Sequence, residues 1–314
     1  MSDPATGSDE AGRLRRIAAT ASLSLAVFLS LTKLAAAIAT DSLAILTSLI
    51  DSLADIAASG ITWFCVRISQ QPPDHRHRYG HGKAESLSAL AQAALVSGTA
   101  VFILVEAIQR FVDPVTIRAS SVGYGVMLLA IVLTIALVLF QKHVIRKTGS
   151  QAIAADSLHY SADLATNLGV LLSIWLASGM GWLQADPVIA LLIAGYLLFN
   201  ATIIGRDAID VLMDHELPGD RRETIKQIVS SNPDVEGFHD LRTREAGTTQ
   251  FIELHVEIDA NMTVEEAHNV TDALEREIFD AFPKAEVIIH QEPAGIDDER
   301  LDHIIAGREK GGSS

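Results

Sequence analysis

The sequence predicts a membrane protein with an all-α domain of six transmembrane helices, followed by a small soluble α+β domain. Composition is the first indication, because 49% of the 314 residues are apolar, only 5% are aromatic, and the mean hydropathy is +0.28. Charge is the second: residues 1–206 hold 14 Lys and Arg against 13 Asp and Glu, whereas residues 207–314 hold 10 against 26. A nearly neutral apolar part joined to an acidic part is typical of a membrane domain followed by a soluble one.

Six apolar segments are the third indication, since a membrane-spanning helix needs about 20 mostly apolar residues. The segments are Ile17–Ala39, Ser42–Val66, Ser86–Ile108, Ser121–Phe140, Ile153–Leu176 and Pro187–Gly205. Residues 1–12 are polar and acidic and lack the pattern of a cleavable signal peptide. We therefore expect a disordered tail over 1–12, a transmembrane domain over 13–206, a cytoplasmic domain over 207–293 and a disordered tail over 294–314.

Acidity and cysteine content narrow the classes of function. An acidic domain repels nucleic acid and attracts cations, which argues against nucleic-acid binding. Cys65 is the single cysteine of the chain, and it can form neither an internal disulfide nor a cysteine-rich zinc cluster. A bound metal would therefore need histidine and carboxylate ligands.

Basic residues in the short connections predict the orientation of the membrane domain. The N-terminus and the even-numbered connections hold ten Lys and Arg, whereas the odd-numbered connections hold two, and basic residues favour the cytoplasmic side. Both termini and the acidic domain should therefore be cytoplasmic. The ten are Arg13, Arg15, Arg16, Arg67, Arg76, Arg78, Lys83, Lys142, Arg146 and Lys147, and the two are Arg110 and Arg118.

A β-hairpin is predicted in the soluble domain. Residues 237–245 and 250–259 are typical of two strands joined at Ala246-Gly247-Thr248. The second strand alternates, so that one set of side chains should face the core and the other should face outward. The inward set is Ile252, Leu254, Val256 and Ile258, and the outward set is Glu253, His255, Glu257 and Asp259.

Two helices and a third strand complete this domain. Asp220 and Glu223 are spaced like a capping box before one helix, and Thr263 and Glu266 before another. A buried strand is expected at residues 286–290. The order helix, strand, strand, helix, strand predicts an open-faced α+β sandwich. The expected core residues of the helices are Ile225, Ile228 and Val229 in the first and Ala267, Val270, Leu274, Ile278 and Ala281 in the second.

Two pairs of ionisable residues lie inside predicted spans. The second span contains Asp51 and Asp55, and the fifth contains His159 and Asp163. Each pair is spaced i, i+4, which puts both side chains on one face of a helix, so two facing helices could bring four ligands to one point. A charge at the bilayer centre costs about 2.5–3.5 kcal/mol, which a bound cation or proton would offset. Carboxylate and imidazole without thiolate suit zinc, and are compatible with manganese, iron(II), cobalt or cadmium.

The ionisable residues of the second and fifth spans have an alternative explanation. They can form hydrogen bonds between helices or lie at the membrane edge in water. Two matched pairs favour the metal site over this alternative. The His- and Arg-rich connection after the second span has a similar alternative, since it can be a solvated loop that follows the positive-inside rule.

Several segments together resemble the cation diffusion facilitators, most closely the bacterial exporters of zinc or ferrous iron. The resemblance covers about Arg13–Pro293. Its motifs are Asp51-Ser-Leu-Ala-Asp55, the loop from Asp74 to Glu85, Leu158-His159-Tyr160-Ser161-Ala162-Asp163, His239-Asp240-Leu241-Arg242 and Ile288-Ile289-His290-Gln291.

The resemblance implies a homodimeric metal/proton antiporter of the bacterial inner membrane, with a ferredoxin-like, metallochaperone-like cytoplasmic domain. It implies three metal sites. The transport site would use Asp51, Asp55, His159 and Asp163, the loop site Asp74, His77 and His81, and the cytoplasmic site His239, His255, His268, His290 and Glu292. Glu292 is a departure, because the members that this sequence most resembles carry Asp there. Lys83 and Asp214 match a charge pair that ties the two domains together, although each is also a simple membrane-flanking charge.

The predicted function is proton-driven export of Zn(II) from the cytoplasm, in which metal and protons compete for the transport site. Export of Mn(II), Fe(II), Cd(II) or Co(II) is an alternative, and a metal sensor or scaffold that does not transport is another. An enzyme is not expected. An intramembrane metalloprotease would need His-Glu-x-x-His on a span, and the sequence contains no such motif.

Overall fold

The computed structural model describes residues 4–40, 43–112, 121–180, 182, 184–296 and 300–304. Within these ranges, the side chains of residues 4–9, 39–40, 43–48, 50–51, 112, 121–124 and 177–178 lie outside the description. The chain forms two compact units, residues 1–212 and residues 213–314. We call them the helical unit and the sheet unit.

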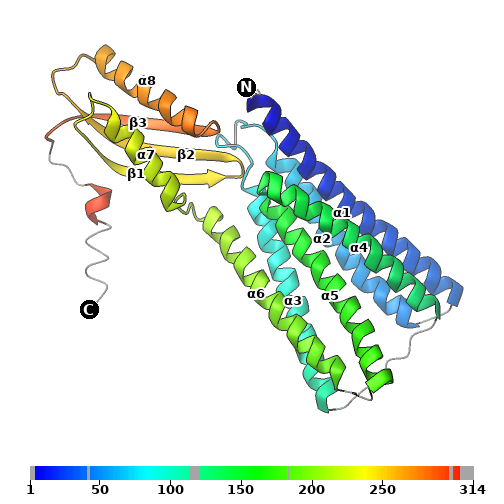
Figure 1. Cartoon of the computed structure of the whole chain (residues 1–314). Helices are drawn as coiled ribbons and strands as arrows, with labels where there is room; N and C mark the ends of the chain where they lie inside the picture. The colour runs from blue at the N-terminus through cyan, green and yellow to red at the C-terminus, as the bar shows by residue number, and fades with distance from the viewer. Residues whose placement is uncertain are drawn as a thin grey trace. The chain divides into compact units, whose positions relative to one another are not determined.

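Six long helices make up the described part of the helical unit (Figure 1). Each predicted span lies almost wholly within its own helix, and the helices extend beyond the apolar segments by up to about three and a half turns. Their bounds are α1 Pro4–Thr40, α2 Leu43–Ser69, α3 Ala84–Val112, α4 Ser121–Thr148, α5 Gln151–Met180 and α6 Ala185–Leu212.

The start of α1 corrects the expectation of a disordered tail over residues 1–12. The helix begins at Pro4, so most of that segment is helical. Proline at the first position of a helix has a suitable φ and needs no intrahelical donor. Ala5, Glu10 and Ala11 then favour continuation of the helix.

Four of the six helices are long and apolar enough to cross a membrane by length and composition: α1, α3, α4 and α6. The other two, α2 and α5, carry the ionisable pairs. The count of six spans is therefore not established by this criterion within the described residues.

The helices pack through small residues and expose large apolar ones. Ala18 and Ala19 of α1 pack with Val66, Val144 and Ile153, and small residues allow helices to approach closely. Polar side chains, by contrast, are buried between helices. Large apolar side chains are exposed at Leu31, Ile38, Phe102, Leu139, Leu192 and Phe199. This inverted distribution is typical of helices surrounded by lipid.

The sheet unit contains α7 Gly219–Ser231, β1 Gly237–Ala246, β2 Thr249–Ile258, α8 Val264–Ala281 and β3 Ala285–Pro293. The strand order is β1-β2-β3, with β1 and β2 antiparallel and β2 and β3 parallel. The predicted hairpin is confirmed, and Gly247 takes a φ of +68° in its turn. The α8 segment connects the two parallel strands.

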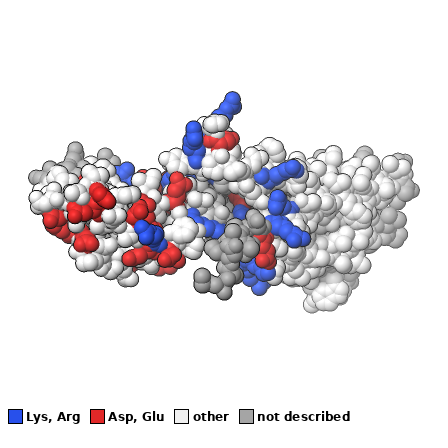
Figure 2. All heavy atoms as spheres, turned by 90° about the horizontal axis from the view of Figure 1, so that it is seen from above, with Lys and Arg blue, Asp and Glu red and all other residues white. Residues whose placement is uncertain are grey.

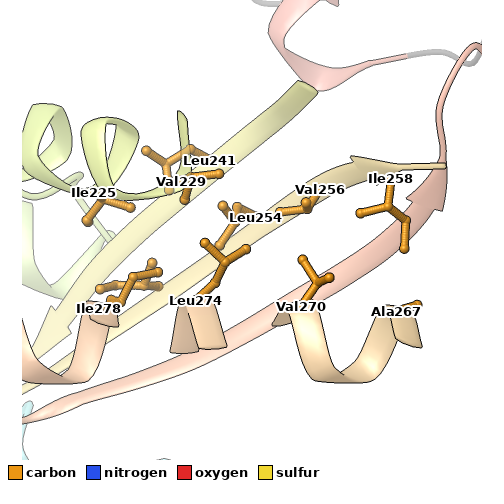
Figure 3. Close-up of a cluster of buried hydrophobic side chains, with 11 residues drawn as sticks. Ile225, Val229, Leu241, Leu254, Val256, Ile258, Ala267, Val270, Leu274 and Ile278 are labelled. Atoms are coloured by element: carbon orange, nitrogen blue, oxygen red, sulfur yellow. The ribbon is translucent and has the colours of Figure 1, made fainter. Parts of the chain in front are cut away.

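One apolar core holds α7, α8 and the sheet together (Figure 3). The predicted inward residues of β2 are all buried, and their neighbours in sequence lie on the opposite face, which α7 and α8 do not cover. Polar side chains of the three strands are therefore available on that open face. The core residues are Ile225, Val229, Leu241, Ile252, Leu254, Val256, Ile258, Ala267, Val270, Leu274 and Ile278.

The two predicted helix starts have different outcomes. Thr263 and Glu266 form a complete capping box before α8, as predicted. Asp220 does not cap α7, because the helix already begins at Gly219 and the amides of Arg221 and Arg222 donate to the carbonyl of Pro218. Ala281, expected in the core, is exposed at the end of α8.

Part of the C-terminal segment is also ordered, which corrects the expectation of a disordered tail over 294–314. Residues 301–304 form a helical turn. Its first amides donate to the carboxylate of Asp240 in β1, and such hydrogen bonds satisfy the free amides of a helix start.

Candidate metal sites

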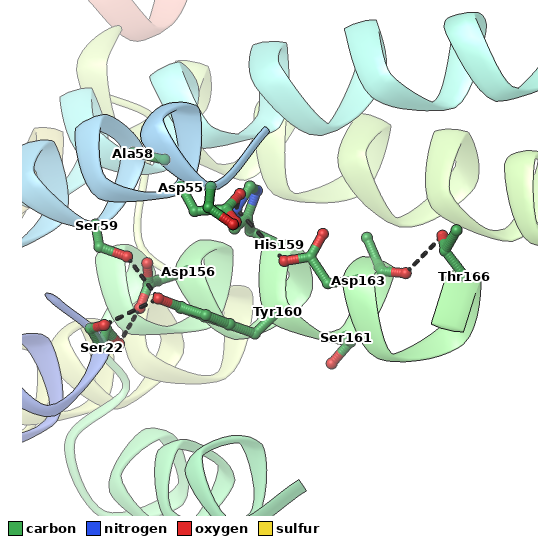
Figure 4. Close-up of polar contacts among 12 residues, drawn as sticks. Ser22, Asp55, Ala58, Ser59, Asp156, His159, Tyr160, Ser161, Asp163 and Thr166 are labelled. Carbon is green, nitrogen blue, oxygen red and sulfur yellow. Dashed lines mark hydrogen bonds and ion pairs between the residues drawn. The ribbon is translucent and has the colours of Figure 1, made fainter. Parts of the chain in front are cut away.

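The first candidate site lies between α2 and α5 in the helical unit (Figure 4). Nε2 of His159 is 3.2 Å from Oδ1 of Asp55 and 3.8 Å from Oδ2 of Asp163. One ligand atom from each of these three residues lies within 4.8 Å of the others. The structure therefore brings together three of the four predicted ligands. Asp51 lies on α2 one turn before Asp55, and its side chain is outside the described residues.

Helix geometry explains this gathering. His159 and Asp163 are four residues apart on α5 and so share one face. Asp55 reaches the same point from α2, which contacts α5. His159 is 9% exposed, whereas the side chains of Asp55 and Asp163 are 24% and 37% exposed, so the histidine is shielded and the carboxylates remain partly open to solvent. Two carboxylates and one imidazole form a donor set for a borderline divalent ion, because no thiolate is present to favour a soft metal.

A buried polar network lies next to this site and was not predicted. Asp156 is fully buried, and its Oδ2 accepts hydrogen bonds from Ser22 and from Nε2 of Gln141, the latter at 2.7 Å. The Tyr160 hydroxyl donates to the Ser22 carbonyl at 2.9 Å. The spacing could have indicated Asp156, since it precedes His159 by three residues and shares its helix face. The network connects α1, α4 and α5 beside the candidate ligands.

The second candidate site is in the loop between α2 and α3. Oδ2 of Asp74 is 3.5 Å from Nε2 of His81, and Oδ1 is 3.3 Å from Nδ1 of His77. The loop is irregular after Pro72 and Pro73, so the ligands do not share a helix face. All three predicted residues are brought together.

Backbone geometry holds Asp74 in this position. Its Oδ1 accepts hydrogen bonds from the amides of His77 at 2.6 Å and Arg76 at 2.7 Å. These bonds keep the pKa of Asp74 below its usual range, because they stabilise the carboxylate. The side chain is half exposed, so this site is open to water.

The third candidate site spans all three strands of the sheet unit. His239, His255 and His290 occupy paired positions on β1, β2 and β3, so their side chains form a row on the open face. Their neighbouring ring centroids are 5.1 Å and 4.8 Å apart.

Glu292 joins these histidines. Its Oε1 is 2.7 Å from Nδ1 of His255 and 3.5 Å from Nε2 of His290, and its Oε2 is 3.4 Å from Nε2 of His239. Ligand atoms of His239, His255 and Glu292 lie within 4.8 Å of one another. The longer side chain of glutamate therefore reaches the histidines.

Glu257 and His268 depart from the predicted ligand set of this site. Glu257 was not predicted as part of the site, yet its Oε1 is 3.1 Å from Nδ1 of His239. Its position two residues after His255, on the same face of β2, was the available signal. His268 was predicted as a ligand, but it lies on α8 with its side chain 66% exposed and its Nε2 3.7 Å from Asp272. The structure does not bring His268 to the row.

The predicted interdomain pair involves one residue from each unit. In the helical unit, Nζ of Lys83 donates to the Leu212 carbonyl at 3.3 Å. In the sheet unit, Asp214 has a φ of +58° and lies 3.5 Å from Nη1 of Arg244. The pairing of Lys83 with Asp214 remains a prediction.

Charge is distributed as the sequence indicated. On the face shown in Figure 2, acidic side chains gather on the sheet unit, whereas a broad part of the helical unit shows no charged side chain. An acidic surface concentrates cations around the sheet unit.

Comparisons with known proteins cover nearly the whole chain. A family described as the cation efflux transmembrane domain matches residues 19–213, and one described as the cation efflux protein cytoplasmic domain matches residues 217–294. The cation-efflux pump FieF of Klebsiella pneumoniae is 45% identical over 285 residues, which cover 91% of this chain and 95% of the pump. FieF of Salmonella typhimurium gives the same values.

Among solved structures, the metal-bound C-terminal domain of the CzcD transporter from Thermotoga maritima is 34% identical. The match covers 25% of this chain and 93% of that domain, with a TM-score of 0.24. The family matches and the identity with the FieF pumps confirm the resemblance, and these relatives are transporters rather than enzymes. The chain belongs to the cation efflux family, the cation diffusion facilitators, and is a multi-pass membrane transporter of cations.

Proposed function

We propose that the chain exports Zn(II) from the bacterial cytoplasm across the inner membrane in exchange for protons. The observation that supports this most directly is the convergence of Asp55, His159 and Asp163 between two helices of the helical unit. Asp51, one turn before Asp55, completes a set of four ligands in the proposal. Four nitrogen and oxygen donors suit the tetrahedral preference of zinc.

The transport site works by competition between metal and protons. A histidine ligand must be neutral and a carboxylate ligand must be ionised, so metal binding and protonation exclude each other. Imidazole is the one ligand type of the four whose charge normally changes near physiological pH, which makes His159 the natural candidate for the proton-responsive ligand. Metal enters from the cytoplasm when these groups are deprotonated, and protons from outside displace it.

Six spans with both termini in the cytoplasm belong to this proposal. In this proposal α2 and α5 also cross the membrane, with their ionisable side chains directed between helices rather than against lipid. The excess of Lys and Arg at the N-terminus and the even-numbered connections supports the cytoplasmic placement of both ends. The FieF pumps, which are bacterial, support the inner membrane as the location.

The histidine row, with Glu292, is proposed as a resident zinc site of the cytoplasmic domain. Its donors fit zinc, because three ligand atoms already lie within 4.8 Å of one another. Bound zinc would supply positive charge that links the three strands. His268 and the loop residues Asp74, His77 and His81 are proposed as further ligands, and the chain is proposed to act as a homodimer.

The test is metal flux into proteoliposomes that contain the purified protein, with an imposed pH gradient. We expect zinc uptake that increases when the vesicle interior is acidic relative to the outside and disappears when an ionophore abolishes the gradient. A panel of Zn(II), Cd(II), Fe(II), Mn(II) and Co(II) would identify the preferred cargo. Zinc binding without flux would instead identify a sensor or scaffold.

A further inference from the structure

The short C-terminal turn of the sheet unit is attached to β1 next to the histidine row. Oδ2 of Asp240 accepts the amide of Leu301 and Oδ1 accepts the amide of Asp302, both at 3.0 Å. The Asp240 amide donates in return to Oδ2 of Asp302 at 2.9 Å. Asp240 is 6% exposed and immediately follows His239 in β1. Three hydrogen bonds therefore attach the segment to a residue adjoining the proposed zinc site.

Arg300 makes a second contact, with a glutamate that also contacts His239 of the histidine row. Its Nη2 is 2.9 Å from Oε1 of Glu257, and the same oxygen is 3.1 Å from Nδ1 of His239. The Arg300 and Glu257 side chains are 24% and 16% exposed, so the pair is largely shielded from water. One carboxylate oxygen thus joins a cation of the C-terminal segment to a histidine of the row.

The two nitrogens of His239 face different partners. Nδ1 faces Glu257, whereas Nε2 is 3.4 Å from Oε2 of Glu292 within the ligand group. A carboxylate that accepts the N–H of a metal-binding histidine orients its ring and increases its basicity. Glu257 is suited to this positioning role while Nε2 binds metal.

A divalent cation on His239 would be close to the Arg300 guanidinium, with one imidazole and one carboxylate between them. Like charges repel, and the repulsion is stronger in a partly buried site than in water. Each cation must therefore weaken the binding of the other, and thermodynamic linkage requires the two effects to be equal.

We propose that residues 300–302 form a strap that metal binding releases. Arg300 serves as the internal counter-charge of Glu257 while the histidine row holds no metal, and zinc at His239, His255 and Glu292 loosens the segment. The strap in turn raises the zinc concentration needed to fill the site. This inference rests on the proposed zinc site of the sheet unit and adds a regulatory contact to it.

The test measures hydrogen exchange of the 301–304 amides by mass spectrometry in the full-length protein in detergent. For the wild type we expect slow exchange without zinc and faster exchange with saturating zinc, whereas magnesium has no effect. Arg300→Gln should give fast exchange in both conditions. Arg276→Gln is the matched control, because Arg276 is exposed on α8 and pairs with Asp272 away from the row. It should behave as the wild type.

Zinc binding at the histidine row is measured separately by equilibrium dialysis. It is the difference between the zinc bound by the protein and the zinc bound by the same protein with Glu292→Gln. Arg300→Gln should lower the dissociation constant for zinc at the row by about fivefold or more, which is the lower end of the usual coupling between two sites. If the row binds zinc but exchange at 301–304 is unchanged or slower, the strap is wrong and the zinc site stands. If Glu292→Gln removes no zinc, the zinc site and the strap are both wrong, even where Arg300→Gln still speeds exchange.

Discussion

Spacing indicated the individual residues of the proposed transport site, because an i, i+4 pair on a helix shares a face. His159 and Asp163 were predicted in this way, and the structure gathers them with Asp55. Glu257 and Asp156 were missed because their partners lie on other elements. Glu257 is one of several outward residues on β2, and only the paired strand β1 brings His239 to it. Asp156 depends on Ser22 and Gln141, which are distant in sequence.

His159→Asp should shift the preference of transport from zinc toward manganese. The substitution replaces the nitrogen donor of the described group with oxygen, and oxygen ligands suit harder ions. The measurement is the ratio of zinc to manganese flux in proteoliposomes.

His143→Asp provides the matched control, because His143 is exposed on α4 and belongs to none of the described ligand groups. Its flux ratio should equal that of the wild type. An unchanged ratio in His159→Asp would count against His159 as a ligand.

Among the elements, helices and strands were predicted well where a local pattern determined them. Alternation in β2 correctly divided buried from outward residues, and the capping box of α8 was visible as Thr263 and Glu266. The start of α7 was misplaced because Pro218 takes the N-cap position, which puts Asp220 inside the first turn, where it cannot act as the cap. The turn at 301–304 was missed because it depends on the distant residue Asp240.

Thr263→Ala should destabilise the start of α8 by about 1 kcal/mol, the usual cost of losing a side-chain cap. The measurement is the hydrogen-exchange protection of α8 amides in the full-length protein. Thr224→Ala is the control, since Thr224 is exposed in α7 and donates only to a carbonyl of its own helix. Equal protection in the two variants would contradict a stabilising cap.

The same capping box should respond to acid. Hydrogen bonds from the amide and hydroxyl of Thr263 hold the pKa of Glu266 below its usual value. A lowered pKa in the folded state means that the stabilisation is complete above the ordinary glutamate pKa and is lost as pH falls through the lowered value. Protection of α8 should therefore fall with acidification more in the wild type than in Thr263→Ala. Equal acid sensitivity would contradict this role.

Close contact between α5 and α6 depends on Gly169. A Cβ at this position would lie 2.8 Å from Cδ1 of Ile193 and 3.0 Å from Cγ2 of Ile189. Gly169→Ala should therefore force these side chains to move and destabilise the helical unit by on the order of 1 kcal/mol. Gly195→Ala on α6 is the control, because no atom lies within 4 Å of its Cβ position.

Thermal unfolding in detergent, followed by size-exclusion chromatography, measures the difference. We expect a lower midpoint for Gly169→Ala than for Gly195→Ala. Equal midpoints would show that α5 and α6 adjust without cost.

For the whole molecule, the division of charge in the sequence indicated a membrane part and an acidic part, and the chain does form two units. Membership of the cation efflux family agrees with this organisation. Composition could not predict which polar residues converge, because convergence depends on the packing of helices and on the strand register. The proposed transport site and the histidine row both gather residues from separate elements.

The central claim is that Asp55, His159 and Asp163 bind the transported metal. It is tested most directly by zinc flux in proteoliposomes with Asp163→Asn, which keeps the side-chain shape but removes the charge. Asp207→Asn is the matched control, because Asp207 is exposed at the end of α6. Both proteins should be inserted to the same extent. The account predicts that Asp163→Asn abolishes zinc flux while Asp207→Asn retains it, and wild-type flux in Asp163→Asn would contradict it.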